Sequence, residues 1–150
     1  MRVSELMNAP TVTVGPGDSI RQAAICLHAH NVGCVLVTVD GLPLGIVTDR
    51  DLALRALAPG LDPQAPVSLV MSEPVVTIDA EADLAEAYRA FRHSGVRRLP
   101  VVSRQRLVGL LAVDDLFLDV FQRYADLLGP VSWSALHDRP LDEGPLHEPA

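Results

Sequence analysis

The chain repeats itself at an interval of 64 residues, and this repeat constrains the fold more than any other feature. When residue n is placed beside residue n+64, the two halves align without a gap. The matching pairs include Val3 and Val67, Met7 and Met71, Pro10 and Pro74, Ala23 and Ala87, Gly45 and Gly109, and Asp51 and Asp115. A repeat of this kind in 150 residues predicts two copies of one supersecondary unit that share a core.

Each copy shows the same series of elements. A short helical turn and a proline precede a β-branched strand, and a helix, two strands and a second helix follow. The expected strands are 11–14, 34–39 and 44–48, then 75–78, 99–102 and 107–112, and the expected second helices are 49–57 and 114–128. The pattern predicts an α/β (α+β) chain of two tandem β-α-β-β-α repeats.

The first helix of each copy carries start and stop signals. Ser19 is followed three residues later by Gln22, and Asp83 by Glu86, which is the spacing of a capping box. Asn31 and Gly95 are residue types that tolerate the left-handed conformation at a helix end. The apolar positions have the period of a helix with one buried face: Ile20, Ala23, Ala24 and Leu27, then Leu84, Ala87, Tyr88 and Phe91.

The repeat also sets the domain boundaries. We expect the first repeat at 1–60, a linker at 61–66, the second repeat at 67–128 and an acidic, proline-rich tail at 129–150. The tail lacks a helical or strand period, which predicts a mobile segment that is dispensable for folding. Docking of Trp133 or Leu136 onto the core is the alternative.

Composition excludes several classes of partner and chemistry. The net charge of −7 and the pI near 5.0 argue against binding to nucleic acid or to an anionic membrane. All basic residues are arginines, so no lysine chemistry is available. Cys26 and Cys34 are too few for a disulfide scaffold, and no signal peptide or membrane span is visible, so a cytoplasmic protein is expected. His28 and His30 are two apart and point to different sides of a helix, so no metal site is predicted.

Two strings of residues identify a family resemblance. Gly45-Ile46-Val47-Thr48-Asp49-Arg50-Asp51-Leu52 in the first copy and Gly95-Val96-Arg97-Arg98-Leu99-Pro100-Val101-Val102 in the second, together with the repeat, closely resemble the CBS domain pair. The resemblance covers about residues 1–128. It implies that the two copies pack sheet to sheet with pseudo-twofold symmetry and leave two clefts, each built from both copies and commonly occupied by an adenosine-containing ligand.

By resemblance, the first cleft comprises Thr48, Asp51, Val75, Val76, Arg97 and Arg98. Asp51 would accept from ribose hydroxyls, the valines would form an apolar wall, and the arginines would lie near phosphates. The second cleft comprises Thr11, Val12, Arg50 and Asp115. It departs from the pattern because Ala112 replaces the threonine, and Gly33 and Cys34 stand at the positions of the arginine pair. We therefore expect the second cleft to bind phosphorylated ligands more weakly. Capping of a helix by Asp51 is the alternative role for that residue.

The sequence therefore predicts a regulatory module that senses an adenine nucleotide and modulates an unidentified protein target in trans. It requires no cofactor, and no catalytic residues are predicted. A dimerisation or scaffold module with degenerate clefts is the alternative. The last predicted helix carries an apolar stripe at Phe117, Val120, Phe121 and Tyr124. Proteins that resemble the CBS domain pair usually form dimers of two modules, so we expect a homodimer.

Overall fold

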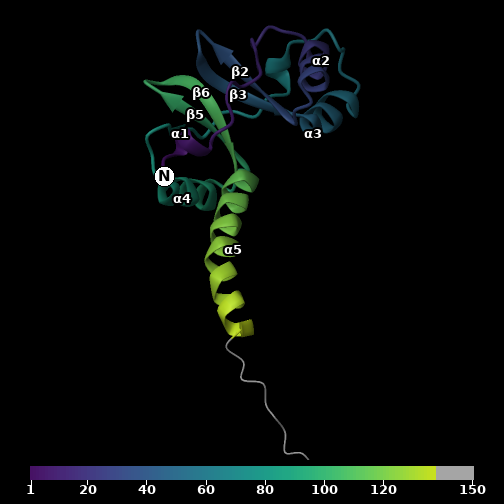
Figure 1. Cartoon of the computed structure of the whole chain (residues 1–150). Helices are drawn as coiled ribbons and strands as arrows, with labels where there is room; N and C mark the ends of the chain where they lie inside the picture. The colour runs from purple at the N-terminus through teal and green to yellow at the C-terminus, as the bar shows by residue number, and fades with distance from the viewer. Residues whose placement is uncertain (138–150) are drawn as a thin grey trace, which may run out of the picture. The chain divides into compact units, whose positions relative to one another are not determined.

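The structure is a computed structural model that describes the backbone of residues 1–137 and the side chains of residues 1–129. Residues Met1–Leu116 form one compact unit, and a second unit begins at Phe117. The first unit contains two three-stranded sheets of identical topology (Figure 1). They consist of β1 (Thr13–Val14), β2 (Cys34–Val39) and β3 (Leu42–Thr48), and of β4 (Ile78–Asp79), β5 (Arg98–Ser103) and β6 (Arg106–Ala112). In each sheet the first strand is parallel to the second, and the second is antiparallel to the third.

The helices also follow the repeat. They are α1 (Val3–Leu6), α2 (Ile20–His30), α3 (Asp49–Asp51) continued by the π-helical η1 (Leu52–Leu57), the 3₁₀ turn η2 (Val67–Leu69), α4 (Leu84–Ser94) and α5 (Val113–His137). The predicted β-α-β-β-α order is therefore confirmed in both copies.

Of the two capping boxes suggested by the sequence, only the one at α4 forms in full, because Gln22 Nε2 donates to Cys26 Sγ and Ser19 alone caps α2. Ser19 Oγ accepts from the Gln22 N–H at 3.0 Å. Asp83 and Glu86 form a reciprocal capping box, with bonds of 2.8 and 3.0 Å. Asn31 and Gly95 end the helices with φ of 50° and 68°, so the left-handed ends are confirmed.

Several predicted boundaries are wrong, and β3, β5 and β6 are each slightly longer than the predicted strands. Only the last part of each predicted first strand forms a ladder, so Thr11, Val12, Val75 and Val76 precede the strands instead of lying within them. The last helix was expected to end near Leu128 but continues to His137. The side chains of Trp133 and Leu136, and all of 138–150, lie outside the described residues.

The core contains most of the predicted positions. Ile20, Ala23, Leu27, Ala87 and Phe91 are buried, and Leu84 is partly buried against its core. The other two apolar positions of the stripe, Ala24 and Tyr88, are exposed. An edge position of a stripe lies between the buried and the solvent face, and hydropathy alone does not decide its side.

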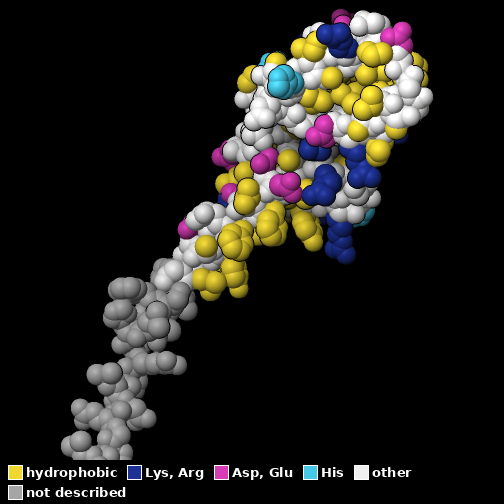
Figure 2. Space-filling view, turned by 90° about the vertical axis from the view of Figure 1, so that its right-hand side faces the viewer, with side chains coloured by type: hydrophobic (Ala, Val, Ile, Leu, Met, Phe, Trp, Pro, Cys, Tyr) yellow, Lys and Arg dark blue, Asp and Glu magenta, His cyan; other side chains and the backbone are white. Residues whose placement is uncertain are grey.

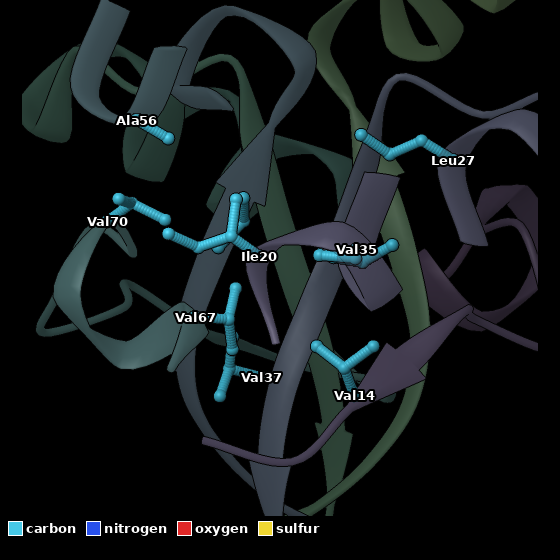
Figure 3. Packing of buried hydrophobic residues seen from close by; sticks show 10 residues of the cluster. Val14, Ile20, Leu27, Val35, Val37, Ala56, Val67 and Val70 are labelled. Carbon is cyan, nitrogen blue, oxygen red and sulfur yellow. The ribbon is translucent and has the colours of Figure 1, made fainter. Parts of the chain in front are cut away.

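The short turn that opens each copy packs on the other copy. Val3 belongs to the core of the second repeat, while Val67 and Val70 belong to the core of the first. Figure 3 shows Val67 and Val70 beside Ile20, with Val37 next to Val67, and all four belong to the core cluster of the first repeat. The two repeats thus exchange their first segments between the two cores.

The exchanged segments pair with the third strands of the opposite sheets. Asn8 forms two backbone hydrogen bonds with Leu110, both 2.9 Å, and Ser72 forms the equivalent pair with Ile46 at 2.9 and 3.1 Å. Because each crossing segment continues into a cleft, each cleft necessarily contains residues of both copies.

Two glycines make room for this crossing. A Cβ placed on Gly45 would collide with the side chain of Met71, and one on Gly109 would collide with Met7. The repeated Met and Gly positions therefore have a steric origin, because the methionine packs where a side chain of the third strand would otherwise stand.

Candidate functional site

A cavity of about 200 Å³ lies where the second copy crosses the first. Its wall contains every predicted residue of the first cleft except Asp51. The lining residues are Ile46, Thr48, Ser72, Pro74, Val75, Val76, Val96, Arg97, Arg98 and Pro100. Three separate segments thus bring two hydroxyls, an apolar wall and two guanidinium groups to one cavity.

Asp51 lies at the start of α3 and is hydrogen-bonded to Thr48. Asp51 Oδ2 accepts from the Thr48 N–H at 2.9 Å, and Thr48 Oγ1 accepts from the Asp51 N–H at 3.1 Å. This reciprocal pair is a capping box, so the capping role considered from the sequence is present. The second carboxylate oxygen, Oδ1, has no hydrogen-bond partner among the described residues and remains available to accept from a ligand hydroxyl.

The two arginines of the first cleft differ in exposure. Arg97 lies 3.7 Å from Asp114 through Nη2 and Oδ1, and the two side chains are 76% and 75% exposed. Such an open pair is strongly screened by water, so it does not withhold Arg97 from a phosphate. Arg98 is partly buried, and no carboxylate of the described residues lies within 4.0 Å of its guanidinium.

The second cleft is a separate cavity of about 220 Å³. Thr11 and Val12 line it as predicted, whereas Asp115 and Arg50 are not among its wall residues. The wall consists of Asn8, Pro10, Thr11, Val12, Val32, Gly33, Cys34, Leu36, Arg98 and Leu110. Asp115 lies beside it and accepts from Asn8 Nδ2 at 2.7 Å. Arg50 is exposed, so the structure does not bring it together with the other predicted residues.

One expectation about the second cleft needs correction. The sequence suggests that this cleft has lost most of its phosphate donors, because Gly33 and Cys34 replace the arginine pair and Ala112 replaces the threonine. In the structure Arg98 lines the second cleft as well as the first. Its Nη2 lies 3.1 Å from the point where a Cβ of Gly33 would stand. The missing side chain of Gly33 thus gives the arginine of the other copy room to reach this cavity.

Cys34 brings no negative charge into the second cleft. Burial raises the pKa of the Cys34 thiol, the Arg98 guanidinium acts in the opposite direction, and Asp49 adds to the rise. Because burial dominates, the thiol stays protonated at neutral pH. An anionic ligand in this cavity therefore meets no opposing thiolate.

Sequence reasoning missed Asn8 and Ser72, which line the two clefts at equivalent positions. A signal was present, since both are polar residues between the matched Met7 and Pro10 and between the matched Met71 and Pro74. The sequence did not reveal the exchange of the opening segments. This exchange pairs Asn8 with Leu110 of β6 and Ser72 with Ile46 of β3, and so brings each residue to a cleft.

None of the described helices is long and apolar enough to cross a bilayer. Within the same part of the chain, no three His, Cys, Asp or Glu side chains gather where they could hold a metal ion.

Comparison with known proteins gives consistent matches. The profile of the CBS domain matches residues 3–57 and 67–120. The CBS domain-containing protein YhcV of Bacillus subtilis is 40% identical over 114 residues, which are 76% of this chain and 81% of that protein.

Two solved structures add to this picture. Hypoxic response protein 1 of Mycobacterium tuberculosis is 33% identical over 75% of this chain and 80% of its own. Its crystal structure, which contains two coordinated zinc ions, superposes with a TM-score of 0.70 over 78% of this chain and 97% of the other. The CBS domain protein PAE2072 of Pyrobaculum aerophilum, solved in complex with AMP, is 28% identical, with a TM-score of 0.70 over 81% of this chain and 99% of the other.

Proposed function

This chain belongs to the CBS domain family, with one CBS domain in each half, and on that premise we propose that it is a non-catalytic regulatory module that binds an adenine nucleotide in the first cleft. The observation that carries the proposal is the meeting of two hydroxyls, an apolar wall and two arginines in one cavity. Its occupancy would regulate a protein partner in trans.

Each part of the first cleft suits one part of a nucleotide. Val75 and Val76 offer an apolar surface to a base. Asp51 does not line the cavity but is hydrogen-bonded to the lining residue Thr48, and its Oδ1 would accept from ribose hydroxyls at the edge of the cleft. Arg97 and Arg98 supply charge-assisted donors for a phosphate. A cavity of about 200 Å³ is smaller than the roughly 300–1,000 Å³ that encloses a drug-sized ligand, so the phosphate would lie at the arginine rim. The complex of PAE2072 with AMP supports this class of ligand.

Isothermal titration calorimetry with AMP tests the proposal, with ADP, ATP, adenosine and inorganic phosphate as comparison ligands. We expect AMP to bind more tightly than adenosine, because only AMP gains the charge-assisted bonds to the arginines. Absence of binding by all of these ligands would overturn the proposal and favour the alternative, a scaffold module whose clefts no longer bind a nucleotide.

We further propose that the chain forms a homodimer through α5. Phe117, Val120, Phe121 and Tyr124 are between 56% and 67% exposed, and the rings of Phe117 and Phe121 stack at 6.4 Å. Figure 2 shows hydrophobic side chains gathered along the described part of this helix. An exposed apolar stripe of this kind favours burial against a partner, and a second copy supplies an identical stripe.

Light scattering tests the assembly. We expect a mass of two chains for the native protein and a shift toward 16.1 kDa for Phe121→Asp, which places a charge in the stripe. Gln122→Glu, which adds a charge elsewhere on the same helix, is the control and should leave the mass unchanged. A native mass of one chain at tens of micromolar would refute the dimer.

A further inference from the structure

Arg98 borders both clefts, and its surroundings favour an anion. It lines both cavities, is partly buried and has no carboxylate of the described residues within ion-pair distance. A guanidinium that has lost part of its hydration without gaining a carboxylate partner gains most from a phosphate, which it binds with two parallel hydrogen bonds.

The first copy has no arginine at the positions equivalent to Arg97 and Arg98. The residue equivalent to Arg98 in the first copy is Cys34, and the residue equivalent to Arg97 is Gly33. The second copy therefore contributes both arginines, while the first contributes the space beside Gly33 that one of them enters. Arg98 lines both clefts, whereas Arg97 lines only the first of the two.

From this arrangement we infer that Arg98 is a phosphate-binding group shared by the two clefts, so that the module holds one phosphorylated ligand tightly at a time. This inference rests on the proposed function. Arg98 carries a single positive charge, which a phosphate in one cleft largely neutralises, so a ligand in one cleft weakens the attraction of Arg98 for a phosphate in the other. The first cleft takes priority because Arg97 adds a second donor there. An adenosine ligand without phosphate escapes this competition.

Gly33 offers a way to move Arg98 without removing it. A Cβ at this position would stand 3.1 Å from Arg98 Nη2, which is the far end of a flexible side chain, and Gly33 does not have a left-handed backbone. Gly33→Ala should therefore fold normally and push the guanidinium toward the first cleft. We expect AMP to bind the first cleft at least as tightly as before and the second about tenfold more weakly.

The decisive experiment is AMP calorimetry on the native chain, Asp51→Ala, and Asp51→Ala combined with Arg98→Gln. The native chain should show one tight event and a second event at least about tenfold weaker. In Asp51→Ala, which weakens the first cleft, the second cleft should bind AMP more tightly than the second event of the native chain, because Arg98 is released to it. Adding Arg98→Gln should remove this gain. Adding Arg89→Gln instead, at an exposed arginine that lines neither cleft, should not.

The outcomes separate the two proposals. Two AMP sites of equal affinity in the native chain, with Arg98→Gln weakening only one of them, would overturn the sharing of Arg98 and leave the proposed function standing. Failure of the native chain to bind AMP at all would overturn the proposed function and the inference with it.

Discussion

The two repeats share one backbone plan but present different side chains to their clefts. The equivalent bonds from Asp49 N–H to Gly33 O and from Val113 N–H to Arg97 O, at 3.2 and 2.9 Å, hold the same junction in each copy. At the cleft surface, however, Thr48 corresponds to Ala112. Arg97 and Arg98, which also line the first cleft, correspond to Gly33 and Cys34, so this cleft differs from its counterpart in three of its polar side chains. Asp51 and Asp115, by contrast, are identical in the two repeats.

The difference predicts unequal effects of matched substitutions on AMP binding. Asp51→Ala should weaken binding ten- to hundredfold, because a hydrogen bond to a charged group contributes roughly 1.5–3 kcal/mol. Asp115→Ala should cost much less, since its carboxylate already accepts from Asn8 and its cleft has no equivalent of Thr48. Calorimetry on the two single variants measures both effects.

A matched control separates binding from capping. Asp51→Ala also removes a capping-box bond, so some stability is lost in either case. Glu86→Ala removes the equivalent bond from α4, where Glu86 Oε2 accepts from the Asp83 N–H, at a position that lines neither cleft. It should lower stability by about 0.5–1 kcal/mol and leave AMP affinity unchanged. Equal affinity losses at Asp51 and Asp115 would mean that the clefts do not differ as argued.

The exchanged opening segments predict stability effects that cross from one repeat to the other. Val3 and Val67 are both fully buried, and truncating either to alanine should lower the free energy of unfolding by about 2 kcal/mol. Because Val3 packs in the second core, Val3→Ala should reduce hydrogen-exchange protection in β5 and β6 more than in β2 and β3. Val67→Ala should do the reverse.

An exposed valine provides the reference for these variants. Val39 is 44% exposed, so Val39→Ala should change stability by less than about 0.5 kcal/mol. If Val3→Ala loosened only the strands of the first repeat, the crossing of the segments would be contradicted.

The local parts of the fold were predictable because their causes are local. The caps at Ser19 and Asp83 and the left-handed ends at Asn31 and Gly95 depend on neighbouring residues, and all of them formed, although the capping box at Ser19 lacks its Gln22 bond. The exchange of the segments that contain Val3 and Val67 was not predictable in this way. The apolar residues of such a short turn can be buried equally well in either core, so the sequence does not show which core the turn enters.

The candidate site shows the same limit. The repeat and its motif placed Thr48, Val75, Val76, Arg97 and Arg98 in one cavity. The reach of Arg98 into the second cavity was missed, because it depends on the absence of a side chain at Gly33, 65 positions away in the sequence (98 minus 33). Arg50 is predicted in the second cleft from its motif position alone, and in the structure it is exposed and does not line that cavity.

The smallest predicted effect concerns the hairpin turns, where the repeats also differ. The turn between β2 and β3 contains Asp40 and Gly41 with φ of 52° and 77°, and the turn between β5 and β6 contains Arg104 and Gln105 with φ of 50° and 67°. A left-handed residue with a side chain is strained, whereas glycine adopts this conformation freely at some cost in unfolded-state entropy. Gln105→Gly should therefore stabilise the protein by about 0.5–1 kcal/mol and raise the melting temperature by roughly 1–4 °C.

Gly41→Ala, the opposite change in the first repeat, should lower the melting temperature, since an added Cβ would also press against Arg106 Nη1 at 3.0 Å. Calorimetric melting of the two variants measures both effects, and a drop in melting temperature for Gln105→Gly would show that the second turn depends on contacts of the glutamine side chain.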